Sequence, residues 1–426
     1  MLSFIITIHR IKAMTLKSFN TRYVKLIRKL VVISVSLLTV TVTLNTSSAT
    51  PLFERKLIAR DGGFGEEFGH AVAISGSTLV VGARADRIGF NPDQGSAYVF
   101  NREVGGWVEQ QKLIASDGAA NDQFGWSVAV SGSTIVVGAW VDDAGSNADQ
   151  GSAHVFNLQN GSWVHTQKLT ASDGAASDLF GWSVAVSGST IIVGAIGDDL
   201  FSGSAYVFNR QGGSWVETQK LTSSGVEFGY SLALSGSTLV VGSISSDSFQ
   251  GAAYVFNRQG ASWVETQKLT ASDGATFDLF GWSVALTGST LVVSARGDTV
   301  GANFDQGSVY VFNQHGGSWV EEQKLTASDG APIDEFGAKV AISGSTIVVG
   351  SPGDDIGGNS AQGSAYLFNR HGGSWVEDEK LTASDGGALE FFGNAVAISG
   401  STVVVGAATD AIGGNLFQGS VYIFEH

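Results

Sequence analysis

The sequence has no cysteine and only 4 prolines among its 426 residues. Without cysteine no disulfide can staple the fold, so stability must come from burial of an apolar core. The 4 prolines stand against 57 glycines, a ratio that indicates many tight turns and excludes a Pro-rich disordered chain. Apolar residues make up 43% of the sequence, which is ample material for a large globular core.

Acidic residues are absent from the first 49 positions, which carry seven Lys or Arg. An apolar run follows at residues 30–44 and ends in the small residues Ser47, Ser48 and Ala49. The run is shorter than the roughly 20 residues that a transmembrane helix needs, and the whole pattern is typical of a signal peptide. We expect residues 1–49 to be cleaved from a chain that is then secreted or held at the cell surface, with an uncleaved anchor as the alternative.

Basic residues are few once this segment is removed: 17 remain against 39 acidic ones. Nucleic acid and anionic membrane surfaces would repel such a chain, so neither is expected as a partner, and no membrane insertion is expected after cleavage.

Residues 50–426 consist of one motif repeated seven times. The copies can be aligned on the Lys of a Lys-Leu pair, and successive lysines are separated by 56, 56, 52, 48, 56 and 56 positions. The seven are Lys56, Lys112, Lys168, Lys220, Lys268, Lys324 and Lys380. A period of this size is typical of an array, a solenoid or a propeller.

One repeat, residues 168–219 together with the Lys220-Leu221 pair that follows, contains four short runs rich in β-branched and aromatic residues: FGWSVAV, TIIVGA, GSAYVF and SWVETQKL. Turn-forming segments separate them, and no segment has a useful helical period. Four antiparallel strands per repeat predict an all-β, seven-bladed propeller.

The ends of the chain predict that the ring is closed. The last repeat stops after its third strand at residue 426, while residues 51–57 (PLFERKL) precede the first complete repeat and match the missing fourth strand. The N-terminal strand would complete the last blade and leave no bare edge to aggregate, so a monomer is expected.

The repeated Phe-Gly, followed by SVAVSG, VVGA and GSAYVF, resembles the FG-GAP repeats of the integrin α-subunit propeller and of exported bacterial proteins. The pairs begin at Phe68, Phe124, Phe180, Phe228, Phe280, Phe336 and Phe392. For function, the resemblance implies only a broad class, extracellular recognition or adhesion. It cannot narrow this class further, because propellers serve many functions. The integrin-type calcium loop between strands one and two is replaced here by SGST, so the calcium sites of that family are not carried over.

Carboxylates concentrate in two sets of loops, those before strand one and those between strands two and three. These loops hold 28 of the 39 acidic residues and four arginines. Both sets emerge on one face of an up-and-down blade, so we expect a face of about −24 on a molecule otherwise near +2, which would attract cations or a basic partner.

One loop offers oxygens for calcium through Asp142, Asp143 and Asp149, although their spacing matches no established motif. The alternative is that such Asp residues only cap turns through their own side chains.

The repeats differ most in the third and fourth copies. Their loops between strands two and three are four residues shorter than in the second copy, and the fourth is also trimmed before strand one. The residue after Phe-Gly is a large aromatic in four consecutive copies, at Trp126, Trp182, Tyr230 and Trp282. Aromatic faces beside polar groups suit sugar rings or peptide side chains. The alternative is that the rings plug the channel or pack blade against blade.

Two functions remain open. The first is a non-enzymatic recognition or adhesion module for an extracellular glycan, peptide or protein. The second is a polysaccharide hydrolase or lyase that uses paired carboxylates of the acidic face as acid and base. A binding module is favoured, because the loop carboxylates belong to the repeated template and no unique one marks a catalytic centre.

Overall fold

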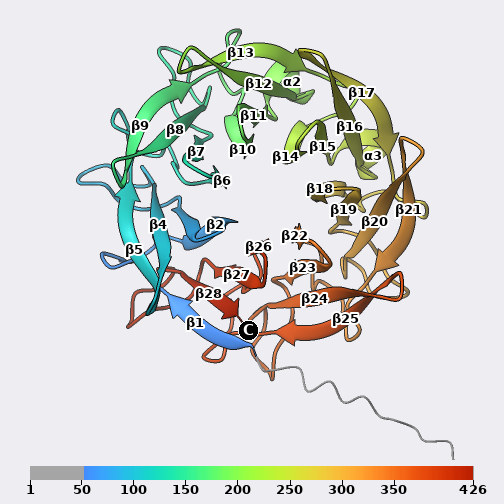
Figure 1. The fold of residues 1–426 in the computed structure, drawn as a ribbon. Helices are drawn as coiled ribbons and strands as arrows, with labels where there is room; N and C mark the ends of the chain where they lie inside the picture. Colours follow the sequence, from blue (N-terminus) through green and yellow to red (C-terminus); the bar gives the residue numbers. More distant parts are fainter. Residues whose placement is uncertain (1–51, 426) are drawn as a thin grey trace, which may run out of the picture. The chain divides into compact units, whose positions relative to one another are not determined.

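The computed structural model describes residues 52–425, which form seven four-stranded antiparallel sheets arranged as the blades of a ring (Figure 1). Blade 1 contains β2 (Phe68–Ser75), β3 (Thr78–Ala83), β4 (Ser96–Glu103) and β5 (Gly106–Leu113). Blade 2 contains β6 (Ser127–Ser131), β7 (Thr134–Ala139), β8 (Ser152–Gln159) and β9 (Ser162–Leu169). Blade 3 contains β10 (Phe180–Ser187), β11 (Thr190–Ala195), β12 (Ser204–Gln211) and β13 (Ser214–Leu221).

The remaining blades repeat this order from the centre outward. Blade 4 contains β14 (Phe228–Ser235), β15 (Thr238–Ser243), β16 (Ala252–Gln259) and β17 (Ser262–Leu269), and blade 5 contains β18 (Phe280–Thr287), β19 (Thr290–Ala295), β20 (Ser308–His315) and β21 (Ser318–Leu325). Blade 6 contains β22 (Lys339–Ser343), β23 (Thr346–Ser351), β24 (Ser364–His371) and β25 (Ser374–Leu381). Blade 7 contains β26 (Ala395–Ser399), β27 (Thr402–Ala407), β28 (Ser420–Glu425) and β1 (Phe53–Leu57).

The predicted seven-bladed propeller is confirmed, and so is its closure. Strand β1 pairs antiparallel with β28, from Phe53 opposite Glu425 to Leu57 opposite Val421. The first strand of the fold thus becomes the outer strand of the last blade, where it lies beside the end of the chain (Figure 1). Pairing of the two ends gives every blade four strands.

The repeated Phe-Gly is explained by packing between neighbouring blades. The Phe180 ring is fully buried among residues of blades 2 and 3, and its amide donates to the carbonyl of Gln150 in blade 2 at 2.8 Å. Gly181 has φ 97°, and a Cβ there would lie 2.2 Å from the Ser152 carbonyl oxygen. Only glycine allows the blades to approach this closely while the chain takes a left-handed conformation.

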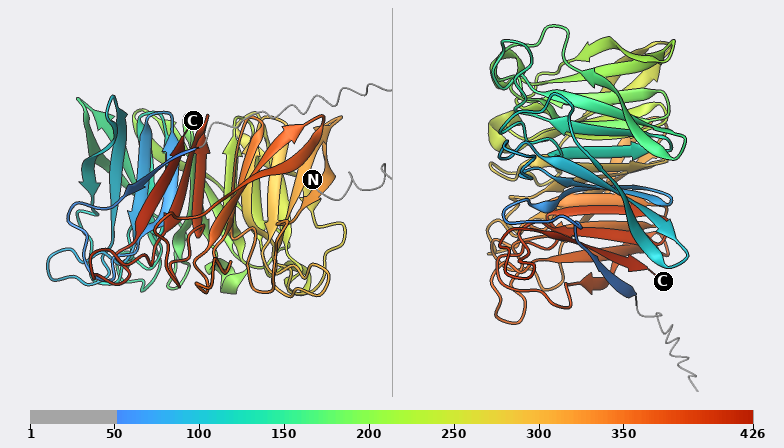
Figure 2. Two further views of the ribbon diagram at one scale, coloured as in Figure 1. Left: turned by 90° about the horizontal axis from the view of Figure 1, so that it is seen from below. Right: turned by 90° about the vertical axis from the view of Figure 1, so that its left-hand side faces the viewer.

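The longer loops gather at one end of the strands, and this end is called the loop face below (Figure 2). It carries the connections into the innermost strands and those between the second and third strands of each blade. The shortened loops of blades 3 and 4 contain the single turns α2 (Asp198–Phe201) and α3 (Ser246–Phe249), each with left-handed residues inside.

The predicted signal peptide at residues 1–49 lies outside the described residues. Within residues 52–425, no helix has both the length and the apolar character that crossing a membrane requires.

Candidate functional site

The central channel contains a cavity of about 610 Å³ on the ring axis. Its wall includes the residue after Phe-Gly from every blade, because each of these residues lies at the start of an innermost strand. The seven are His70, Trp126, Trp182, Tyr230, Trp282, Ala338 and Asn394. The four aromatic residues singled out from the sequence therefore line one cavity together.

These four rings form an arc, called the aromatic arc below. The ring centroids of Trp126 and Trp182 are 4.9 Å apart, those of Trp182 and Tyr230 5.5 Å, and those of Tyr230 and Trp282 4.9 Å. Neighbouring rings are tilted by 47–49° and each is only partly buried. The rings thus pack blade against blade and also present surface to the cavity, so both interpretations of the sequence describe part of their environment.

A second set of residues extends the arc, and sequence reasoning missed it. Trp140 directly follows β7 and lies 4.8 Å from Trp126 and 5.1 Å from Trp182, centroid to centroid. At the equivalent position of blades 1 and 5, the Arg84 and Arg296 guanidinium groups lie 5.2 and 4.4 Å from the ring centroids of Trp126 and Trp282. Variation at the position after VVGA was the signal that could have found them.

Both arginines also pair with carboxylates. Arg84 contacts Glu67 at 2.6 Å, and Arg296 forms an ion pair with Glu335. Burial, and then the positive charge of Arg84, lower the pKa of His70 to about 3, so this histidine is neutral at physiological pH. The indole NH of Trp282 donates to the Ala338 carbonyl at 3.1 Å, which holds that ring in place.

The arc ends at blade 5, because blades 6 and 7 have smaller residues at the aromatic position. Ala338 and Asn394 take the aromatic position there, and Lys339 follows Ala338 on the wall of the cavity. The Lys339 side chain reaches water in the channel. The surrounding wall excludes much of the bulk solvent, and this effect together with Arg296 lowers the pKa of Lys339 to about 8.

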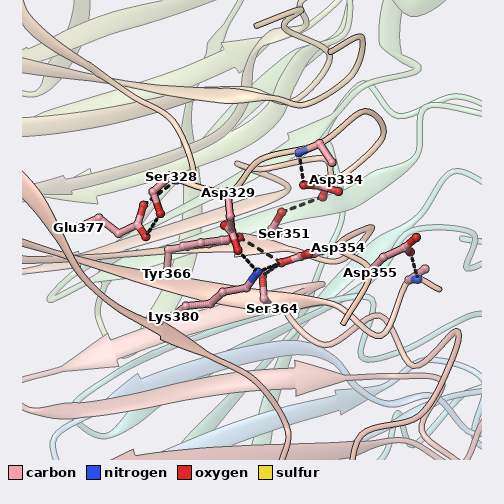
Figure 3. Close-up of polar contacts among 12 residues, drawn as sticks. Ser328, Asp329, Asp334, Ser351, Asp354, Asp355, Ser364, Tyr366, Glu377 and Lys380 are labelled. Atoms are coloured by element: carbon pink, nitrogen blue, oxygen red, sulfur yellow. Dashed lines mark hydrogen bonds and ion pairs between the residues drawn. The ribbon is translucent and has the colours of Figure 1, made fainter. Parts of the chain in front are cut away.

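The loop carboxylates form ion pairs, as Figure 3 shows for blade 6. Lys380 lies 2.7 Å from Asp329 and 2.6 Å from Asp354, and the Tyr366 hydroxyl lies within hydrogen-bond distance of both carboxylates, at 2.8 and 3.0 Å (Figure 3). Burial alone would lower the pKa of Lys380, but its hydrogen bonds with the two carboxylates outweigh burial and raise it. We call this arrangement the Lys-Asp cluster.

Six blades contain the Lys-Asp cluster, and in each the Lys contacts two carboxylates at 2.5–2.8 Å. In blade 4, Lys268 contacts Asp247 alone, at 2.7 Å. The charge of about −24 expected for the loop face was counted without these lysines, which were placed with the rest of the molecule. That placement is wrong. Their ammonium groups lie among the loop carboxylates and neutralise part of the charge.

A third carboxylate lies beneath each of several clusters. Asp334 is buried and accepts a hydrogen bond from the Ala331 amide at 2.6 Å (Figure 3). Burial, followed by the nearby charge of Asp354, raises its pKa to about 6. Asp122 in blade 2 has the same surroundings, and its pKa is also raised to about 6.

Two of the three candidate calcium ligands, Asp142 and Asp143, make other contacts through their carboxylates. Asp142 belongs to the Lys-Asp cluster of blade 2, 2.7 Å from Lys168, and Asp143 accepts the backbone NH of Asp149 at 2.9 Å. Within residues 52–425 there is no group of three or more acidic, His or Cys side chains arranged to hold a metal ion. Asp142 and Asp143 thus have structural roles, and calcium binding stays a prediction.

The shortened loop of blade 3 borders a different cavity from the aromatic arc. A pocket of about 490 Å³ lies between residues 173–178 and residues 197–201 of blade 3. It shares no lining residue with the channel cavity. Loop trimming in blade 3 and the aromatic run therefore border two separate cavities, although both fall on neighbouring repeats of the sequence.

Comparison with protein families gives seven matches to the model described as FG-GAP repeat. They cover residues 52–100, 107–156, 163–208, 215–256, 263–312, 319–368 and 375–424. The chain belongs to the FG-GAP repeat family. Each match begins in the outer strand of one blade and ends in the third strand of the next, so the sequence unit of this FG-GAP propeller is offset from its structural blade. A comparison with curated protein sequences finds no match.

Proposed function

We propose that this FG-GAP propeller is a non-enzymatic recognition module that binds an extracellular ligand in the channel cavity. The part of this cavity that the aromatic arc lines is called the channel mouth below. The observation that carries the proposal is that the channel wall collects residues that differ between blades. The Lys-Asp clusters of the outer loops recur in six blades and hold the loops together. Around the channel cavity, by contrast, four consecutive blades contribute aromatic residues and the others contribute small or polar ones. Partly exposed aromatic faces beside polar groups suit a glycan or peptide, and a protein could present either.

The enzymatic alternative finds little support in the channel. Glu335 is the one carboxylate in the cavity wall as described, and it is paired with Arg296. Glycoside hydrolysis requires two carboxylates on opposite sides of the scissile bond. Many carboxylates of the outer loops contact lysines instead, as Asp329 and Asp354 do, so these are poorly placed to serve as an acid and base pair.

The proposal places the protein outside the cell, either secreted or retained at the surface. FG-GAP propellers are typically extracellular, and the basic and apolar segment at residues 1–44 fits an export signal. A monomer is proposed, because the pairing of β1 with β28 closes the ring.

The test replaces Trp182 and Tyr230 by Ala and measures binding to a glycan and peptide array together with thermal stability. We expect loss of ligand binding with modest loss of stability, because the rings are only partly buried. A fully buried aromatic would cost about 3–5 kcal/mol when removed. Trp319→Ala provides that reference, because Trp319 is a buried residue of the outer strand of blade 5.

Phe304→Ala is the matched control, since this loop-face aromatic is 53% exposed and lies outside the cavity. If the Trp182 and Tyr230 variants bind like the parent, or unfold as early as Trp319→Ala, the arc is structural and the proposal fails.

A further inference from the structure

Lys339 replaces a serine of the repeat. The residue two positions after Phe-Gly is Ser127, Ser183, Ser231 and Ser283 in blades 2–5, and it is Lys339 in blade 6. Three of these serines donate to a glycine carbonyl of the next blade at 2.6–2.8 Å, which links neighbouring blades. A lysine cannot reproduce this short contact, so blade 6 gives up a repeated link and gains a cation.

Among residues 52–425, the charge of Lys339 has no carboxylate partner. Every Lys-Leu lysine contacts at least one carboxylate, whereas no carboxylate of the described residues lies within 4.0 Å of the Lys339 ammonium group. The nearby Arg296 is paired with Glu335, and His70 is neutral. With a pKa of about 8, Lys339 remains mostly protonated at neutral pH. The cavity wall therefore carries one uncompensated positive charge.

The size of the cavity favours a small ligand or the end of a chain. Its volume of about 610 Å³ falls within the range of about 300–1,000 Å³ that is common for small-molecule sites. A long anionic polymer would lie across the acidic outer loops and meet repulsion there, but charges farther than about 8 Å are largely screened at physiological ionic strength. The acid group of a short ligand can thus contact Lys339 without strong repulsion, because the loop carboxylates are far from it.

We propose that the channel mouth binds an acidic saccharide, with a sugar ring against the aromatic arc and its carboxylate on the Lys339 ammonium group. This rests on the proposed function, because the arc is the surface that would hold the ring. Sugar rings have flat C–H faces that suit indoles. A carboxylate with an ammonium forms a charge-assisted hydrogen bond, which is stronger than a neutral one. A peptide that ends in a carboxylate is the competing ligand, and the test separates the two.

The experiment measures binding of uronate tetrasaccharides and of their carboxyl-reduced, neutral counterparts by calorimetry on the parent protein. We expect the acidic form to bind at least about tenfold more tightly than the neutral form, as a hydrogen bond to a charged group allows. Lys339→Ser should remove this preference while weak binding of the neutral form persists. Serine is the residue of four other blades at this position, so the variant is expected to fold, and Lys339→Arg should retain the preference.

Trp182→Ala separates the two proposals, because it should weaken both tetrasaccharides. Equal binding of acidic and neutral forms by the parent, or an unchanged preference in Lys339→Ser, would overturn the acidic-ligand proposal while leaving recognition at the arc intact. If neither saccharide binds, the acidic-saccharide proposal is also overturned. A panel of peptides with free or amidated C-termini, tested on parent and Trp182→Ala, then decides the proposed function.

Discussion

The outer loops of the loop face and the channel mouth derive from the same seven repeats, yet they use charge in opposite ways. In the loops, the same carboxylates recur and lysines of the outer strands neutralise them, as Lys380 does for Asp329 and Asp354. In the channel, Lys339 appears once and has no carboxylate partner among the described residues within 4.0 Å. The comparison teaches that abundant, repeated charge supports the scaffold here, whereas a single departure marks the candidate site.

Replacing one lysine in each region should produce the largest difference between them. Lys324→Met would leave the buried Asp298 and the nearby Asp273 without their cation. Loss of one partner from a buried pair costs about 3–5 kcal/mol, and we expect the lower end here because Lys324 and Asp273 are partly exposed. Lys339→Ser should cost almost nothing, because no ion pair is lost. Denaturant unfolding of both variants measures the two values. Similar losses would mean that Lys339 is a scaffold residue too.

A pH series should sharpen the comparison with a smaller effect. The pKa of Asp334 is about 6 in the folded protein, above its ordinary value of 3.8. The folded state therefore binds more protons than the unfolded state between these values, and stability falls as pH rises through about 6. Asp334→Asn should raise the melting temperature at pH 8 by about 1–3 °C and reduce its decline between pH 5 and pH 8. An equal decline in variant and parent would contradict this assignment.

Calcium is expected to give the smallest effect. The oxygens of Asp142 and Asp143 already contact Lys168 and the Asp149 amide, so millimolar calcium and magnesium should change the melting temperature equally and little. A larger rise with calcium than with magnesium, lost in Asp143→Asn, would instead support a specific site, because calcium accepts more ligands in a looser geometry.

Much of the fold was predictable because its signals are local. Phe180 and Gly181 recur in every repeat with the alternating apolar residues and turn segments of short strands, and each pattern acts within a few residues. The four strands predicted in residues 168–219 agree with β10 to β13, although β12 continues through Gln211. The candidate site was predicted only in part. Trp126, Trp182, Tyr230 and Trp282 line one cavity, but Lys339 in the same wall and Trp140, which packs against the Trp126 ring, were missed.

The sequence by itself determined the number of blades, the strands within each blade and the closure of the ring. Repeats and strand patterns are local features of the sequence, so they can be recognised without the structure. The tertiary structure alone decided which charges meet. Lys380 and Asp329 are 51 positions apart but 2.7 Å apart in space, and Arg296 and Glu335 pair across two blades. Such contacts depend on the curvature of the ring and on side-chain direction, which no local pattern encodes. For the same reason, only the folded ring shows that the loop carboxylates are partly neutralised and that Lys339 in the channel has no carboxylate partner among the described residues.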